Sequence, residues 1–189
     1  MTDKFITPPA RLSYPSLFKT SSFRGDDSGK YEATFIFDAD ADLSRLKALA
    51  LNALKEKFPK MSDEDIKAQV KSGAMNWPFR KGDEKPNAPE LEGKVFFKAS
   101  SKERPGVVDD RLDPITEPGE IYPGCWVRAS VNVYAFDNRA KGVAIGLRNV
   151  QKVRDGEPLG GGRSRPEDDF EPLDTSDISE KSGGGDFLD

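Results

Sequence analysis

The sequence predicts a mainly β protein, a small five-stranded antiparallel barrel with one or two inserted helices. Runs rich in β-branched and aromatic residues recur along the chain, and turn-forming stretches separate them. Between residues 42 and 72 the apolar spacing changes to that of a helix. The last 35 of the 189 residues show neither pattern, so about 154 residues remain to form one domain.

Two strands are expected before residue 40. Residues 11–18 combine apolar and aromatic side chains with a proline, which favours an edge strand or a broken strand because proline has no amide hydrogen. Residues 31–37 are rich in strand-forming types, and the polar stretch 24–30 before them predicts a turn.

Two helices are expected at about 42–58 and 62–72, where leucines, alanines and other apolar residues recur at helical spacing. Their ends are predicted from capping chemistry, because short polar side chains bind free amides and glycine or proline stops a helix. The residues expected to begin or end them are Asp42 and Pro59 for the first, and Ser62, Asp65 and Gly73 for the second.

The rest of the folded part returns to strands, expected at 94–101, 125–137 and 143–153. A long irregular connection precedes the second of these, and a turn at 138–142 joins the last two into a hairpin. A small closed barrel leaves no sheet edge exposed, and the OB-fold is such a barrel with five strands. We therefore expect an OB-fold domain at 1–154 and a disordered acidic tail at 155–189.

The strand at 125–137 has two chemically different faces. Its small apolar face suits a barrel interior and comprises Cys125, Val127, Ala129, Val131, Val133 and Ala135. The opposite face carries aromatic rings, one arginine and small polar groups but no acid, and comprises Trp126, Arg128, Ser130, Asn132, Tyr134 and Phe136. In the partner strand, small residues at 144 and 146 leave room above the sheet.

Aromatic rings interleaved with cations on one sheet face are what single-stranded nucleic acid requires, because bases stack on rings and phosphates pair with cations. The same pattern recurs in neighbouring strands, where the candidate contacts are Phe96, Lys98, Lys102 and Arg148. The alternative is that Trp126, Tyr134 and Phe136 pack beneath the inserted helices. Arg128 and Asn132 favour the binding interpretation, since burying them without partners would be costly.

A second aromatic and basic cluster lies at the mouth of a loop and contains Trp77, Arg80 and Lys81. These residues could clamp a nucleic-acid strand. Equally, the loop could insert its hydrophobic end into the barrel. The sequence alone leaves both interpretations open.

Composition argues against common catalytic chemistry. The chain has no histidine and one cysteine, which removes the usual zinc sites, histidine-based triads and any intrachain disulfide. We expect no cofactor, no metal, no membrane segment and no enzymatic activity. Two alternatives remain: a metal-dependent nuclease that uses Asp109, Asp110 and Asp113, and an adaptor whose aromatic face binds another protein.

The chain is charged asymmetrically. Residues 155–189 contain 11 acidic and three basic residues and carry a net charge of −8. Since the whole chain carries −4, residues 1–154 carry +4. This asymmetry suggests a body that binds a polyanion and a tail that competes with it, with Asp186, Phe187, Leu188 and Asp189 as the handle for partner proteins.

Four stretches make the chain similar to the single-stranded DNA-binding proteins of tailed bacteriophages. They are RLSYPSLF, WPFRKGDEK, FFKASSKERPGVVDD and PGCWVRASVNVYAFDNRAKGVAIGLRNVQKVRDGEPLGG, and together they cover most of residues 5–162. The resemblance implies an OB-fold that coats single-stranded DNA, without sequence specificity, in the infected bacterium's cytoplasm. It also implies roles in replication, recombination or repair. The tail looks like the acidic, Phe-containing ends of other such proteins, which recruit replication proteins. Removing it is expected to permit duplex binding as well.

Overall fold

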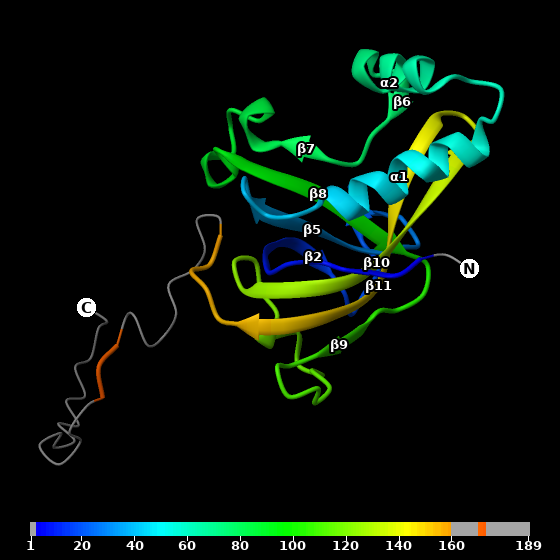
Figure 1. The fold of residues 1–189 in the computed structure, drawn as a ribbon. Coiled ribbons are helices and arrows are strands. Elements are labelled where there is room, and N and C mark those ends of the chain that lie inside the picture. Colours follow the sequence, from blue (N-terminus) through cyan, green and yellow to red (C-terminus); the bar gives the residue numbers. More distant parts are fainter. Residues whose placement is uncertain (1–2, 160–169, 173–189) are drawn as a thin grey trace, which may run out of the picture.

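The structure, a computed structural model, describes residues 3–159 and 170–172, and its centre is a closed five-stranded barrel (Figure 1). The barrel strands are β2 (Ala10–Ser16), β5 (Tyr31–Asp38), β8 (Lys94–Ser101), β10 (Trp126–Asp137) and β11 (Lys141–Arg154). Their order is β2-β5-β8-β11-β10, and β10 closes the ring by pairing with β2. The predicted five-stranded barrel with two helices is therefore confirmed.

One pairing differs from the fully antiparallel prediction. β8 and β11 are parallel, with Ala99 opposite Ile145 and Ser100 opposite Gly146. Parallel neighbours cannot be joined by a hairpin. Here the whole segment between them, which includes β10, supplies the crossover.

The barrel interior follows the predicted alternation. Cys125, directly before β10, and the next three inward positions to Val131 are at most 1% exposed, and Val133 is 7% exposed. Phe97 of β8 packs against Phe35 and Phe37 of β5, with ring centroids 5.7 and 5.2 Å apart. Burial of these rings and of the β-branched side chains between them is the main stabilising contribution to the barrel.

Of the two alternatives predicted for residues 11–18, the structure shows the broken strand. β2 is not an edge strand, because it lies between β5 and β10. It is a broken strand, since its ladder with β5 is interrupted between Ser13 and Ser16. Pro15 lies in this gap and cannot donate a backbone hydrogen bond, and Tyr14 has a φ of 45°.

Helices α1 (Ser44–Lys57) and α2 (Asp63–Ser72) lie together on one side of the barrel (Figure 1). α1 buries Leu46, Ala50 and Leu54, the stripe that the sequence indicated. It begins at Ser44 with Leu43 at the N-cap position, so the prediction of Asp42 as the cap is wrong, although the Asp42 carboxylate accepts a 3.1 Å hydrogen bond from the Ser44 amide. For α2 the predicted capping box and its left-handed glycine, Gly73 with φ 81°, are both confirmed.

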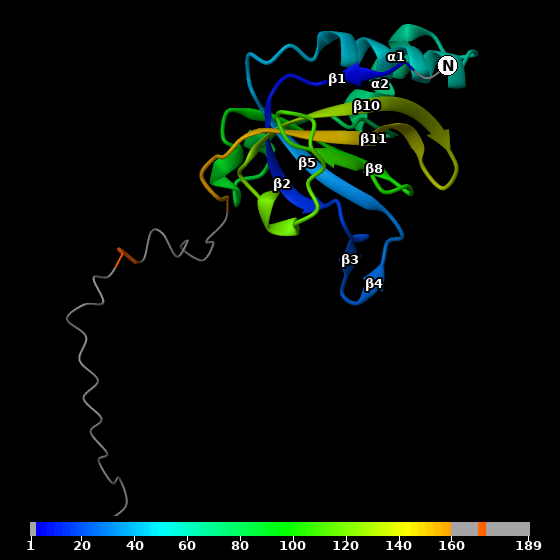
Figure 2. The same ribbon diagram turned by 90° about the horizontal axis from the view of Figure 1, so that it is seen from below.

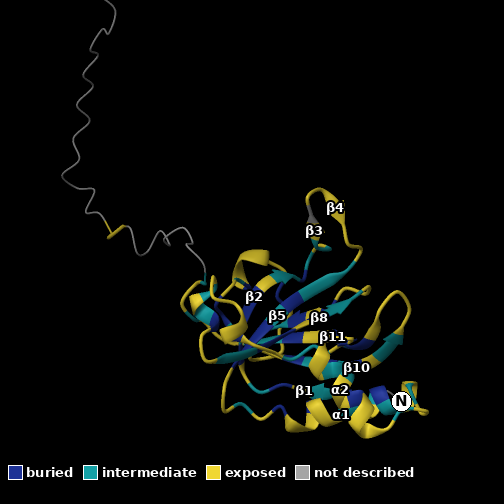
Figure 3. Ribbon diagram, turned by 90° about the horizontal axis from the view of Figure 1, so that it is seen from above, coloured by how far each residue is buried: buried dark blue, intermediate teal, exposed yellow. Residues whose placement is uncertain are grey.

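Several short elements were not predicted, because two or three residues carry too little pattern to show a period. The strands are β1 (Phe5–Ile6), β3 (Ser22–Phe23), β4 (Asp26–Asp27), β6 (Met75–Asn76), β7 (Arg80–Lys81) and β9 (Gly106–Val108). The 3₁₀ turns are η1 (Gly82–Glu84), η2 (Pro89–Leu91) and η3 (Pro118–Glu120). β3 and β4 form a hairpin that projects on the side away from the helices (Figures 2 and 3). β6 pairs with β11 and β7 with β8, which fixes the loop between them against the barrel.

The packed body extends beyond the predicted boundary at residue 154. The Leu159 amide donates to the Pro123 carbonyl at 2.9 Å, and the Tyr122 hydroxyl donates to Asp155 at 2.8 Å. Gly124, with φ 106°, lies so close to the Glu157 carbonyl that a Cβ would be 2.0 Å from its oxygen. Residues 155–159 therefore pack on the barrel rather than belonging to the tail. In the described ranges, no helix is long and apolar enough to span a membrane.

Candidate nucleic-acid interface

A groove of about 540 Å³ lies over the outer face of β5, β8 and β11, beside the loop between β6 and β7. Its floor consists of small side chains from three neighbouring strands: Thr34, Ser100 and Ala144. Trp77 and Pro78 of the loop and Arg80 of β7 line it, and Lys85 and Lys98 add two further cations. The groove thus has an aromatic ring and three cations around a floor of small side chains.

The strand register explains why the floor is low. Thr34 is opposite Lys98, and Ala144 is opposite Tyr134 of β10, while Ser100, Gly146 and Asn132 form the next row. A Cβ on Gly146 would lie 2.6 Å from the Asn132 side-chain oxygen. Small residues therefore occupy the middle of the face, and Tyr134, 40% exposed, borders it on β10.

The loop that lines the groove is anchored by Phe79. Its ring packs edge-on against Phe97 of the core, with centroids 5.8 Å apart, and Trp77 lies against Phe79 at 5.3 Å. The side chain of Phe79 is therefore partly buried and packs against the hydrophobic core of the barrel. Trp77 and Arg80 line the groove at the same time, while Lys81 is exposed but not part of the lining.

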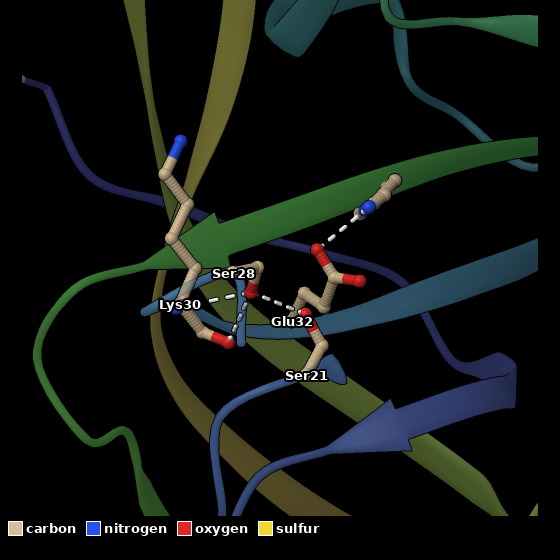
Figure 4. A network of polar contacts seen from close by, with 5 residues as sticks. Ser21, Ser28, Lys30 and Glu32 are labelled. Carbon is tan, nitrogen blue, oxygen red and sulfur yellow. Dashed lines mark hydrogen bonds and ion pairs between the residues drawn. The ribbon is translucent and has the colours of Figure 1, made fainter. Parts of the chain in front are cut away.

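The groove cation Lys98 already has a protein partner. Its ammonium lies 2.6 Å from the Glu32 carboxylate, whose side chain is 21% exposed. Figure 4 shows Glu32 near the serine network of Ser21 and Ser28 that precedes β5. At the far end of β5, six residues beyond Glu32, Asp38 is likewise paired with Lys94. A phosphate that binds Lys98 must therefore compete with Glu32.

The predicted aromatic contacts differ in their exposure. Phe96 is only 7% exposed, because it packs with Ile36 and Leu91 beneath η2. The ring of Phe96 therefore offers little exposed surface for a base to stack on, although Phe96 lines the groove and the Lys85 ammonium lies 5.5 Å from its ring centroid. Phe136 is half-buried opposite Gly142.

The outer face of β10 does not form one continuous surface with the groove. A register shift between Ser130 and Val131 divides the strand, and β-bulges of this kind increase local twist. Beyond it, Arg128 donates to Gln151 at 2.6 Å and lines separate hollows next to Ile6. Trp126 lies under the Arg154 guanidinium, 4.6 Å from its ring centroid.

Two predicted phosphate contacts lie outside the groove lining. Arg148 falls in the same register shift and is exposed, and Lys102 is exposed in the turn that follows β8. The groove consequently unites Trp77, Arg80, Phe96 and Lys98 and borders on Tyr134, but it does not include Trp126 or Arg128.

The acidic cluster is built as a turn. The Asp109 carboxylate accepts hydrogen bonds from the amides of Arg111 and Asp113 at 2.8 and 2.9 Å. Within residues 3–159 and 170–172, no three acids, cysteines or histidines are grouped to hold a metal. Cys125 is buried, and burial raises the pKa of its thiol. The tail candidates Asp186, Phe187, Leu188 and Asp189 lie outside the described residues.

Among the polar groove residues that sequence reasoning did not name as contacts are Thr34, Lys85 and Ser100. Thr34 and Ser100 face outward from correctly predicted strands, but a small polar side chain is unremarkable until neighbouring strands are aligned. Lys85 stands in a loop without periodicity. Small residues that lie opposite one another on neighbouring strands can be recognised as a groove floor only when the order of the strands in the sheet is already known.

The barrel and its aromatic, cation-lined groove define a protein of the OB-fold class, a class that commonly binds oligonucleotides or oligosaccharides. A family model described as the single-stranded DNA-binding protein of Enterobacter phage Enc34 matches residues 3–181. The chain belongs to this family. A curated relative, putative protein p50 of Acyrthosiphon pisum secondary endosymbiont phage 1, is 32% identical over 173 residues, which cover 90% of this chain and 94% of p50.

Solved structures agree with this assignment. The Enc34 single-stranded DNA-binding protein in complex with single-stranded DNA is 26% identical, with a TM-score of 0.59, over 83% of this chain and 89% of that one. Gp2.5 of bacteriophage T7, a single-stranded DNA-binding protein, is 18% identical, with a TM-score of 0.59, over 97% and 98% of the two chains. The second likeness shows the shared fold.

Proposed function

We propose that this protein binds single-stranded DNA in the groove between the Trp77 loop and the outer face of β8, and that it has no enzymatic activity of its own. The observation that carries the proposal is the groove itself, in a family with a solved single-stranded DNA complex. Bases would stack on Trp77 and Tyr134, and phosphates would pair with Arg80, Lys85 and Lys98. Stacking on π-faces is tolerant of sequence, so binding would be non-specific.

The charge asymmetry supports a second part of the proposal. The segment after the body carries most of the negative charge of the chain, and a linked polyanion competes with DNA at an effective concentration of about millimolar. We assign to this segment both competition with DNA and the recruitment of replication proteins through Asp186–Asp189. The protein would then act in replication, recombination or repair of phage DNA in the host cytoplasm, and it would bind duplex more readily without the tail.

The test compares ring substitutions in the full-length protein. Trp77→Ala and Tyr134→Ala are expected to weaken binding by about 1–3 kcal/mol each, or roughly 5- to 150-fold, which is the measured range for one stacked base. Trp126→Ala is the matched comparison, because Trp126 is an aromatic residue of the same strand as Tyr134 but lies away from the groove. Binding would be followed by fluorescence anisotropy with a labelled strand of about 16 nucleotides, the upper end of an OB-fold site.

Each outcome of this experiment has a definite meaning. Loss of affinity for Trp77→Ala and Tyr134→Ala with little change for Trp126→Ala would place the DNA in the groove. Equal losses for all three would extend the site over the whole of β10. No DNA binding by the unaltered protein at low salt would overturn the proposal and favour a protein-binding adaptor. Unfolding temperatures of all variants would exclude loss of fold as the cause.

A further inference from the structure

A second hollow, beside the proposed DNA groove, lies between the two helices. Its volume is about 410 Å³, within the range of about 300–1,000 Å³ that is usual for ligand pockets. Its apolar lining is formed by Ala48 and Leu51 of α1, Val70 of α2, and Trp77. Leu51, Val70 and Trp77 are only half-buried, so apolar atoms of all three remain open to a ligand.

Three exposed lysines surround this apolar hollow: Lys47 of α1, and Lys67 and Lys71 of α2. Lys67 and Lys71 are four residues apart and therefore share one side of α2. Among the described residues, none of the three has a carboxylate within ion-pairing distance, and the Lys47 ammonium lies over the ring of Phe79 at 5.8 Å. The hollow therefore combines an apolar floor with a rim of cations that no acidic side chain neutralises in this part of the structure.

Trp77 connects this hollow to the DNA groove, because it lines both. The chain runs from α2 through β6 to the Trp77 loop, and β7 then holds that loop beside β8 (Figure 1). The groove and the hollow are thus neighbours on the two sides of one indole. A strand that leaves the groove past Trp77 therefore reaches the hollow directly.

We propose that single-stranded DNA longer than the groove continues past Trp77 into the hollow between α1 and α2. A base would pack against Leu51 and Val70, and the phosphates beside it would pair with the three lysines. A single strand supplies both chemistries that the hollow presents, because each unpaired base has an apolar π-face and each phosphate a charge. This inference rests on the function proposed above and extends its site from the sheet to the helices.

The apolar floor would also help the protein to distinguish single strands from duplex. The bases of a duplex are paired and stacked within the double helix, so only its phosphates could reach the hollow. A duplex would gain the contacts to Lys47, Lys67 and Lys71 but none to Leu51 and Val70. The helices would therefore add more affinity for a single strand than for a duplex of the same length.

The first test removes two of the lysines from the full-length protein. Lys67→Ala/Lys71→Ala should reduce the slope of log affinity against log salt by about 1.4, the value for two single-strand phosphates, when a labelled strand of about 16 nucleotides is titrated. Between about 50 and 200 mM salt this variant should therefore lose affinity about sevenfold less than the unaltered protein. Lys57→Ala/Lys60→Ala removes the same charge outside the hollow and should leave the slope unchanged.

The second test locates the strand. A strand of about 16 nucleotides that carries a diazirine on one base, placed at a different position in each preparation, is irradiated in complex with the unaltered protein. The cross-linked peptides are then identified by mass spectrometry. We expect cross-links from bases near one end of the strand to the parts of α1 and α2 around Leu51 and Val70. Lys67→Ala/Lys71→Ala should lower the yield of these cross-links, relative to those in the groove, about fivefold or more, and the control pair should not.

Cross-links confined to β5, β8 and β11 would overturn the inference and leave the hollow to a protein partner. A slope equally reduced by both pairs of substitutions would reduce the contact to general charge attraction and also overturn it. If the unaltered protein binds single strands but is indifferent to Lys67 and Lys71, this inference alone fails. If it binds no single strand at low salt, the proposed function fails as well, so the two failures are distinguishable.

Discussion

Replacing Glu32 with glutamine should tighten the proposed binding of single-stranded DNA, because Glu32 competes with phosphate for Lys98. The two groups are 2.6 Å apart, and the Lys98 side chain is 59% exposed, so the ammonium can reach either partner. Glutamine keeps the size and polarity of the side chain but removes its charge. The variant therefore tests whether Lys98 is a phosphate contact without removing Lys98.

The magnitude follows from the exposure of the pair. Partly exposed ion pairs contribute about 0.2–1 kcal/mol, so releasing Lys98 should raise the affinity about 1.4- to 5-fold. Lys98→Ala should reduce the slope of log affinity against log salt by about 0.7, the value for one single-strand phosphate. Between about 50 and 200 mM salt that variant should therefore lose affinity about 2.6-fold less than the unaltered protein. Combined with Lys98→Ala, the Glu32→Gln change should have no further effect.

Anisotropy titrations at several salt concentrations would measure both quantities. Asp38→Asn is the control, since Asp38 pairs with Lys94 on the same two strands and Lys94 does not line the groove. It corrects for the general effect of removing one negative charge. Equal gains for Glu32→Gln and Asp38→Asn, or a gain that persists in the Lys98→Ala background, would refute Lys98 as the phosphate partner.

Three further expectations concern the floor, the anchored loop and the buried thiol. Ala144→Leu should weaken the binding of single-stranded DNA by about 1–3 kcal/mol, the equivalent of one stacked base. Ala140→Leu, at the exposed hairpin tip, should leave the affinity unchanged. Equal titration curves for the two variants would contradict the role of the floor. Phe79→Ala should lower the free energy of unfolding by about 2 kcal/mol, which is less than the roughly 3–5 kcal/mol lost with a fully buried ring. The unfolding temperature should fall by about 4–8 °C, and an unchanged melting curve would show that the ring does not anchor the loop. Cys125 should react with a thiol reagent only when the protein opens. Burial blocks access to the thiol, and it also raises the thiol pKa, which lowers the fraction present as thiolate. Rapid labelling of the native protein would argue against a closed barrel end.

Much of the fold could be predicted from the sequence because each long element carries its own period. The alternation in β10 and the leucine stripe of α1 identified both elements and the side that each one buries. Their neighbours in space were harder. The parallel pairing of β8 and β11 and the inner position of β2 depend on barrel closure, which no local pattern records.

The candidate site was predicted less completely, for a related reason. Residues of one strand were expected to act as one face, yet Trp126 and Tyr134 lie on either side of a register shift. An irregularity of one residue redirects the rest of a strand and depends on the partner strand as much as on the strand itself. Conversely, Trp77 and Lys98 are distant in sequence but line one groove, because β6 and β7 fix the loop beside β8.

The two short strands therefore matter more to the proposed function than their length suggests. Without β6 and β7 the outer face of β8 would be an open sheet surface with one lysine already paired to Glu32. With them, the segment can both pack Phe79 against the core and line the groove with Trp77 and Arg80. A ring fixed in this way loses little conformational freedom when a base stacks on it. The anchoring of the loop and the binding surface are thus one arrangement, and a change in either is expected to affect the other.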